Sequence, residues 1–149
     1  VLAERKAHAV AAGRDEGLVV GCDTILVMDG EACGKPVSLD QARQWCRAQR
    51  NTTVEVVTGH CVIDASSATR ACRASWSSVM VGPISDAEIE AYLATGEALQ
   101  AAGGLTIDGY GAPFISGIRG DHGTVIGISL PTLRDLLAEL DVPISALWR

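Results

Sequence analysis

The segment Leu18–Met28, with the sequence LVVGCDTILVM, decides the fold of this chain. Its residues are mostly apolar and often β-branched at both odd and even positions, which predicts a strand buried on both faces. Asp29-Gly30 follows directly, and this dipeptide is a strong signal for a two-residue hairpin turn. The sheet is therefore predicted to be at least partly antiparallel.

Helix and strand signals continue on both sides of this strand. Capping boxes, in which a serine and a later acid or amide cap the same helix start, begin at Ser38 and Ser85. From Ala101 to Gly127 the chain is dense in glycine, which predicts tight turns and close backbone approach. The predicted elements are helices over 1–12, 38–49, 85–96 and from Pro131 onward, strands over 53–64 and 70–81, and short strand pieces over 105–107 and 113–118. Together they predict an α/β fold with a mixed, partly antiparallel central sheet flanked by helices.

Length and composition limit the number of domains and the class of partners. The chain has 149 residues, of which 48% are hydrophobic, and this is enough for one globular core, so a single domain over 1–149 is predicted. The net charge of -6 argues against binding to a nucleic-acid backbone. The sequence has neither a bilayer-length apolar run nor a signal-peptide pattern, so no membrane partner is expected. The five cysteines include no C-x-x-C pair, which predicts reduced thiols rather than a zinc site or disulfides.

Asp23 is the most informative polar residue because it interrupts the apolar strand. Alternate residues of a strand share a face, so Asp23 is predicted to lie beside Val19, Ile25 and Val27. A carboxylate in such surroundings is paired, hydrogen-bonded, metal-bound or placed at a cleft, because an uncompensated buried charge is costly. Two interpretations stay open from the residues alone: a functional carboxylate, or a structural Asp bonded to backbone amides at a bulge.

Three further positions could serve an anionic ligand. Lys35 follows a glycine and precedes a proline on a constrained loop, and the hairpin could return its ammonium to the side of Asp23. A solvated loop lysine is the alternative, and the same choice applies to Lys6 on the first predicted helix. Asp108 lies among the glycines of 103–111, where backbone amides can approach a ligand, although plain turn chemistry explains that pattern as well.

Taken together, several short motifs resemble the Maf family in their order and spacing. They are Lys6-Ala, Gly21-Cys-Asp-Thr24, Gly34-Lys-Pro36, Val57-Thr-Gly59, Glu88-Ile-Glu-Ala-Tyr92, Gly96-Glu97, Ala102-Gly103, Ile107-Asp-Gly109 and Val125-Ile-Gly127. The resemblance implies a cytoplasmic hydrolase that cleaves nucleoside triphosphates between the α and β phosphates, giving the monophosphate and pyrophosphate. It also implies a fold similar to that of the inosine triphosphate pyrophosphatases, and assembly as a homodimer, which is frequent in the family.

The resemblance further implies a role for each candidate residue. Asp23 resembles the family's proton acceptor and a ligand of a divalent metal cation, Mg2+ or Mn2+. Lys6 and Lys35 resemble the cations that hold the phosphates. Thr24 resembles a position that tunes base specificity, and Asp108 stands at a substrate-binding position where many members carry Gln. The resemblance to the family also implies dTTP, UTP or modified nucleotides as substrates, although Asp108 in place of Gln departs from the pattern of members that prefer thymidine and uridine nucleotides.

One family feature is not found within these residues. Members normally begin with a strand and a Ser-x-Ser-Pro-Arg-Arg loop, whereas this sequence opens at Val1 within a predicted helix. We therefore expect an N-terminal segment upstream of it. Two hypotheses follow: a nucleoside triphosphate pyrophosphatase, or a catalytically inactive relative that binds nucleotides weakly or serves as a structural or interaction fragment.

Overall fold

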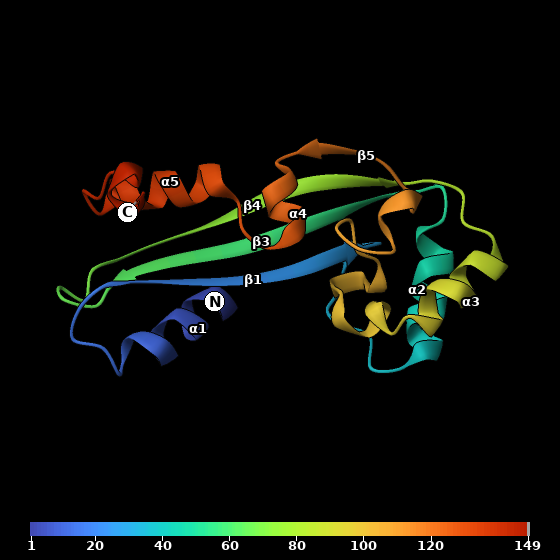
Figure 1. The fold of residues 1–149 in the computed structure, drawn as a ribbon, viewed down its shortest axis with the longest axis horizontal. Coiled ribbons are helices and arrows are strands. Elements are labelled where there is room, and N and C mark those ends of the chain that lie inside the picture. Colours follow the sequence, from blue (N-terminus) through green and yellow to red (C-terminus); the bar gives the residue numbers. More distant parts are fainter. Residues whose placement is uncertain (149) are drawn as a thin grey trace. The chain divides into compact units, whose positions relative to one another are not determined.

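The computed structural model describes residues 1–148 and contains one five-stranded sheet with flanking helices (Figure 1). The elements are α1 (Leu2–Ala11), β1 (Leu18–Met28), β2 (Glu31–Cys33), α2 (Leu39–Gln49), β3 (Thr53–Asp64), β4 (Arg70–Val81), α3 (Asp86–Ala94), β5 (Ile115–Gly120), α4 (His122–Ile126) and α5 (Leu130–Glu139), with short 3-10 turns at Glu97–Gln100, Ala102–Gly104, Ala112–Phe114 and Ile144–Leu147. The strand order is β2-β1-β3-β4-β5, and the pairs β1/β2 and β4/β5 are antiparallel. The predicted α/β fold is confirmed. Within residues 1–148 no helix is long and apolar enough to cross a bilayer.

The chain folds into two compact units, and each unit is assembled from segments that are separate in the sequence. The first unit comprises residues 1–23, 58–75 and 127–148, and the second comprises residues 24–57 and 76–126. Strands β1, β3 and β4 each pass from one unit into the other. Each unit has buried cores of its own.

In the first unit, successive residues of β3 pack against different helices. Val62 packs with the buried leucines of α5. Its neighbours Cys61 and Ile63 lie on the other face of the strand and pack with Ala7 of α1. Figure 1 shows α5 and α1 on opposite sides of these strands. The strand is therefore buried on both faces, which explains why this part of the sequence is apolar at consecutive positions.

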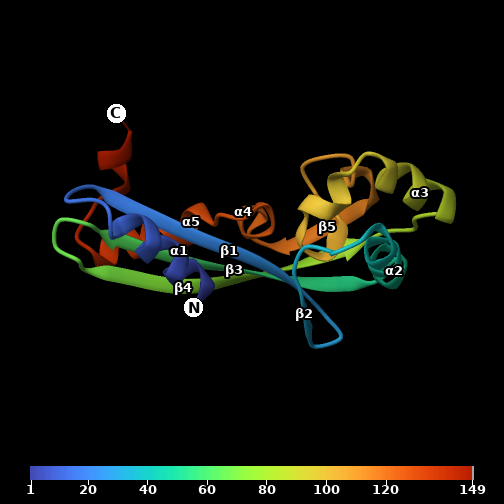
Figure 2. The same ribbon diagram turned by 90° about the horizontal axis from the view of Figure 1, so that it is seen from below.

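In the second unit, α2 and α3 lie side by side (Figures 1 and 2). Both helices start at the predicted serines: Ser38 Oγ accepts a hydrogen bond from the Gln41 amide at 3.2 Å, and Ser85 forms a reciprocal capping box with Glu88. The buried core of this unit consists of Leu26, Cys33, Ala42, Cys46, Val54, Val56, Val79, Val81, Ile84, Ile89, Tyr92, Leu93, Ala98 and Leu105.

The predicted hairpin turn between β1 and β2 is confirmed. Asp29 and Gly30 have φ values of 52° and 82°. This left-handed backbone region suits glycine and is tolerated by Asp, and it matches the twist of a tight hairpin. The two strands pair from Met28 opposite Glu31 onward.

The strand predicted over 105–107 is wrong, and β5 begins at Ile115 rather than at residue 113. Gly103 and Gly104, with φ values of 71° and 78°, turn the chain immediately before this segment, and Leu105 is extended but belongs to no strand. The hydrogen-bond donors that follow bind a carboxylate, that of Glu97, in place of a neighbouring strand.

The expectation of reduced cysteines is also wrong for one pair. Cys61 of β3 and Cys72 of β4, both in the first unit, form a disulfide. Adjacent strands bring their Cα atoms to 4.1 Å, and this proximity across two strands has no signature in cysteine spacing. Cys22, Cys33 and Cys46 are free thiols.

Candidate functional site

The face of β1 that carries Asp23 is covered by α1. Val19 lies on this face and packs with Ala7 of α1. Gly21, two residues on, contacts the same helix so closely that a Cβ there would lie 2.8 Å from the Ala7 Cβ atom and nearer still to the Ala3 carbonyl oxygen. Only glycine permits this approach, because Cβ atoms do not come so close to other atoms. The helix therefore lies directly against the strand immediately before Asp23.

Asp23 forms an ion pair with Lys6 of α1. The Lys6 ammonium also donates to the Cys22 carbonyl oxygen at 3.4 Å. The Asp23 side chain keeps 20% of its exposure and that of Lys6 keeps 59%, so both groups can be reached from solvent. Asp23 thus has the cationic partner that a carboxylate in an apolar strand requires, and the partner orients one of its oxygens. The structure brings these two predicted residues together.

Lys35, a residue of the second unit, lies on an exposed loop whose backbone is anchored on both sides. The Gly34 carbonyl accepts a hydrogen bond from the Gly103 amide at 2.9 Å. Pro36 is buried, and a Cβ at Gly104 would lie 3.4 Å from its Cγ atom. The loop of Lys35 is therefore fixed to the start of the glycine-rich segment that leads to Asp108.

Thr24 and Asp108 also belong to the second unit. Thr24 follows Asp23 on β1 and is half-buried. Asp108 is exposed, in a loop between Leu105 and the 3-10 turn that starts at Ala112. The chain thus exposes a carboxylate at the position where the family resemblance implies contact with the nucleotide.

Glu97 is a functional candidate that sequence reasoning missed. Its carboxylate accepts hydrogen bonds from the Thr106 hydroxyl and from the amides of Tyr110 at 3.0 Å and Gly111 at 3.2 Å. Burial opposes ionisation of this group, but these hydrogen bonds outweigh it and lower the pKa of Glu97. Gly96-Glu97 is one of the family-like motifs, yet its donors lie 9 to 14 residues downstream, so local patterns carry no sign of the contact.

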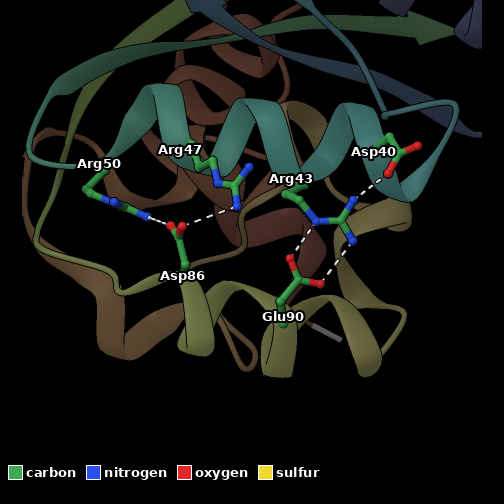
Figure 3. Close-up of polar contacts among 6 residues, drawn as sticks. All are labelled: Asp40, Arg43, Arg47, Arg50, Asp86 and Glu90. Carbon is green, nitrogen blue, oxygen red and sulfur yellow. Dashed lines mark hydrogen bonds and ion pairs between the residues drawn. The ribbon is translucent and has the colours of Figure 1, made fainter.

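Two arginines of α2 and Arg50, which follows the helix directly, are engaged in ion pairs with neighbouring acids (Figure 3). Arg43 pairs with Asp40 and with Glu90 of α3, and Arg47 and Arg50 both pair with Asp86. Hydrogen bonds from Arg43 lower the pKa of Glu90, and those from Arg50 and then Arg47 lower that of Asp86. These cations join two helices of the second unit, which is a sufficient structural role for them.

A divalent cation would find a restricted set of ligands in this chain. Within residues 1–148 no three side chains of His, Cys, Asp or Glu are grouped to hold a metal by themselves. Mg2+ that binds together with phosphates takes only one or two protein carboxylates and completes its shell with phosphate oxygens and water. Asp23, a partly exposed single carboxylate, fits that requirement.

The fold and the Lys6–Asp23 pair define an α/β protein whose sheet presents an oriented carboxylate to solvent. The chain belongs to the Maf-like protein family, whose model matches residues 1–140. A Streptomyces avermitilis protein named nucleoside triphosphate pyrophosphatase is 50% identical over 149 residues, covering 99% of this chain and 72% of the relative. Relatives with the same name from Salinispora tropica and Synechococcus elongatus are 46% and 44% identical, and the matches cover 67% and 75% of their lengths. The predicted family is therefore confirmed.

Proposed function

We propose that this protein is a nucleoside triphosphate pyrophosphatase that releases pyrophosphate and leaves the nucleoside monophosphate. The observation that carries this proposal is the ion pair between Lys6 of α1 and Asp23 of β1, found in a chain whose relatives are named for this activity. A solvent-accessible carboxylate held by an ammonium has the elements that water attack at a phosphate requires, namely a proton acceptor and a local positive charge.

In the proposed reaction, a water oxygen forms a bond to the α phosphorus of the substrate. The bond from this phosphorus to the oxygen that bridges the α and β phosphates breaks, and pyrophosphate leaves with that electron pair. The proton of the water passes to the Asp23 carboxylate. Because repulsion from the phosphate oxygens limits the attack, cations around the substrate lower the barrier.

Lys6 and Lys35 are the proposed cations of this chain. Lys6 orients Asp23 in the free protein, and its exposed ammonium has further N–H groups that can donate to phosphate oxygens. Lys35 is exposed on an anchored loop, which fixes the base of its side chain while leaving the ammonium accessible. A bound Mg2+ or Mn2+, with Asp23 as its protein ligand, would supply further neutralisation of the phosphates.

Thr24 and Asp108 are the proposed residues for contact with the nucleotide base. A carboxylate accepts hydrogen bonds, so Asp108 favours a base edge that presents N–H donors. The imide N–H of thymine and uracil is one such donor, in keeping with dTTP, UTP or a modified nucleotide as substrate. Support for these substrates comes from the exposure of Asp108 and from the family resemblance.

A nucleotide panel tests the proposal. The protein is incubated with Mg2+ and dTTP, UTP, dATP, ATP, dGTP or dCTP, and the released pyrophosphate and orthophosphate are measured separately. Asp23→Asn should lower the rate by about a hundredfold or more, because it removes the proton acceptor. The control is Asp15→Asn, which removes an exposed acid of the same unit. Chelation with EDTA should abolish the activity and added Mg2+ should restore it.

Each alternative gives a different result in this panel. Release of orthophosphate in place of pyrophosphate would contradict the reaction class. An Asp23→Asn variant as active as Asp15→Asn would contradict the assignment of the proton acceptor. Nucleotide binding without hydrolysis would favour the inactive nucleotide-binding relative.

The proposed setting is the cytoplasm, where nucleoside triphosphates are abundant, and the proposed assembly is a homodimer. Both proposals rest on the family resemblance. Light scattering on the eluted peak of a gel-filtration column measures the molar mass. A mass of one chain across the working concentrations would contradict the homodimer.

A further inference from the structure

The loop from Thr106 to Gly111 is folded around the carboxylate of Glu97. Glu97 Oε1 accepts hydrogen bonds from the Thr106 hydroxyl and, at 3.2 Å, from the Gly111 amide. Glu97 Oε2 accepts one from the Tyr110 amide at 3.0 Å. Both oxygens are therefore occupied by donors from a single loop. Glu97 therefore connects three residues of the loop.

Two glycines of this loop lie in close contacts, Gly109 with the Glu97 carboxylate and Gly111 with the Thr106 backbone. A Cβ at Gly109 would overlap the Glu97 carboxyl group, and a Cβ at Gly111 would lie 2.9 Å from the Thr106 amide nitrogen. Any side chain at Gly109 would therefore displace either Glu97 or the loop. Close packing against Glu97 explains the glycine at 109, and close approach to the Thr106 backbone explains the glycine at 111.

The loop has a second attachment, at Tyr92 of α3. The Tyr92 hydroxyl accepts a hydrogen bond from the Thr106 amide at 3.3 Å, and it also hydrogen-bonds to Glu97. Tyr92 is buried in the core of the second unit, and burial raises the pKa of its hydroxyl to about 12. The hydroxyl therefore stays protonated at neutral pH and connects the loop and Glu97 to the core.

Asp108 lies between the two ends of the loop that Glu97 holds. Residues 106, 110 and 111 are fixed by hydrogen bonds to Glu97, while Asp108 itself is exposed. The backbone of Asp108 is thus bounded by anchored residues two positions away on each side. The direction in which its carboxylate is presented depends on these anchors.

We propose that Glu97 is a positioning residue that holds the 106–111 loop in the shape in which Asp108 meets the base of the bound nucleotide. This inference rests on the proposed function, because it assigns Glu97 to base recognition at the same site. Glu97 acts through Asp108 and does not touch the reacting phosphate. Its loss therefore weakens nucleotide binding and the discrimination between bases, and leaves the chemical step largely intact.

The test compares Glu97→Gln with the matched control Glu88→Gln. Glu88 is another hydrogen-bonded glutamate of the second unit, but its hydrogen bonds are with Ser85, where it caps α3. Glu97→Gln replaces one acceptor oxygen by an NH2 group. This group faces a hydrogen-bond donor of the loop and cannot accept its hydrogen bond. We expect KM to rise about tenfold with kcat within about threefold of wild type, and the preference among bases to flatten. Glu88→Gln should lower the unfolding temperature and leave KM and base preference unchanged.

Two milder variants, both at Thr106, keep the test valid if Glu97→Gln does not fold. Thr106→Val removes the hydroxyl donor to Glu97, whereas Thr106→Ser retains it. We expect the valine variant to show the same rise in KM and the serine variant to recover wild-type values. Valine and serine variants with equal KM and equal base preference would overturn the proposed role, as would a Glu97→Gln variant that matches Glu88→Gln.

Equilibrium binding of the α,β-methylene analogues of UTP and ATP separates failure of this inference from failure of the proposed function. A wild-type protein that binds the analogues and hydrolyses no nucleotide contradicts the proposed function alone. The positioning role then stands if Glu97→Gln binds them about tenfold more weakly. A wild-type protein that neither binds nor hydrolyses overturns both.

Discussion

Gly21 of β1 and Ala7 of α1 are packed so tightly that a Cβ on the glycine would lie 2.8 Å from that of the alanine. Two residues after Gly21 the strand presents Asp23, and one residue before Ala7 the helix presents Lys6. The ion pair between these two side chains is therefore set up by the close contact of the backbones that carry them. A change at Gly21 should act on the candidate site without removing any functional group.

Gly21→Ala should destabilise the protein by about 3 kcal/mol, because the added methyl group overlaps both the backbone and a side chain of α1. Pyrophosphate release should fall as well, since the displaced helix carries Lys6 away from Asp23. Urea unfolding and the nucleotide assay measure the two effects. Gly13→Ala is the control, because a Cβ at Gly13 has nothing within 4 Å. Equal stability of the two variants would show that α1 does not lie against the strand as described.

Lys6→Met should separate activity from stability. The ion pair with Asp23 is partly exposed, and such pairs contribute less than about 1 kcal/mol to folding. Loss of a cation near the phosphates should nevertheless reduce pyrophosphate release by about tenfold or more. Arg5→Met, which removes the adjacent exposed cation of α1, serves as the comparison in both the unfolding and the nucleotide assays. An equal loss of activity in both variants would indicate a general effect of charge rather than a role for Lys6.

The contribution of Glu97 to stability should depend on pH. The pKa of Glu97 in the folded protein is lowered from 4.5, the ordinary value that applies to the unfolded chain. Its stabilising effect is therefore fully present above pH 4.5 and is lost as the pH falls through the lower folded-state pKa. At pH 7 Glu97→Gln should be less stable than wild type by about 1 to 3 kcal/mol, since the carboxylate accepts several hydrogen bonds.

Urea unfolding of wild type and Glu97→Gln at a series of pH values measures this difference. The two proteins should converge in stability as the pH falls below 4.5. The other acids with lowered pKa values, Asp64, Asp86, Glu88 and Glu90, titrate in both proteins and so cancel in the comparison. A difference that stays constant across the acid range would mean that ionised Glu97 does not hold the loop.

Asp86→Asn should affect the helix pair of the second unit and leave catalysis unchanged. Asp86 accepts from Arg47 and Arg50 at the exposed surface between α2 and α3 (Figure 3). Its loss should lower the melting temperature slightly at low ionic strength and hardly at all at high salt, because salt screens exposed charges. Melting curves at both salt concentrations check this. Altered nucleotide kinetics in Asp86→Asn would place these arginines closer to the substrate than their pairing indicates.

Much of the local structure could be predicted from the sequence because short-range interactions determine it. The apolar run of β1, the turn at Asp29-Gly30 and the helix starts at Ser38 and Ser85 depend on residues within a few positions of one another. Asp23 could be found in the same way, because an acid within an apolar strand is a conflict visible in a short window.

Other features required contacts between residues far apart in the sequence. The ion pair joins positions 6 and 23, the disulfide joins Cys61 to Cys72, and Glu97 reaches donors as far as Gly111. The strand predicted at 105–107 failed for the same reason: the Thr106 amide donates to the Tyr92 hydroxyl and the Thr106 hydroxyl to Glu97, so distant side chains take the place of a neighbouring strand.

The α/β class, the hairpin, the helix starts and the choice of Asp23 as a candidate followed from the sequence alone, because the hydrophobic pattern, turn residues and capping residues act over a few neighbouring positions. Only the tertiary structure decided that Lys6 is the partner of Asp23, that Gly21 must lack a side chain, and that Glu97 shapes the loop of Asp108. These outcomes depend on which surfaces pack together, and close packing and hydrogen-bond satisfaction are properties of the folded chain rather than of any short segment.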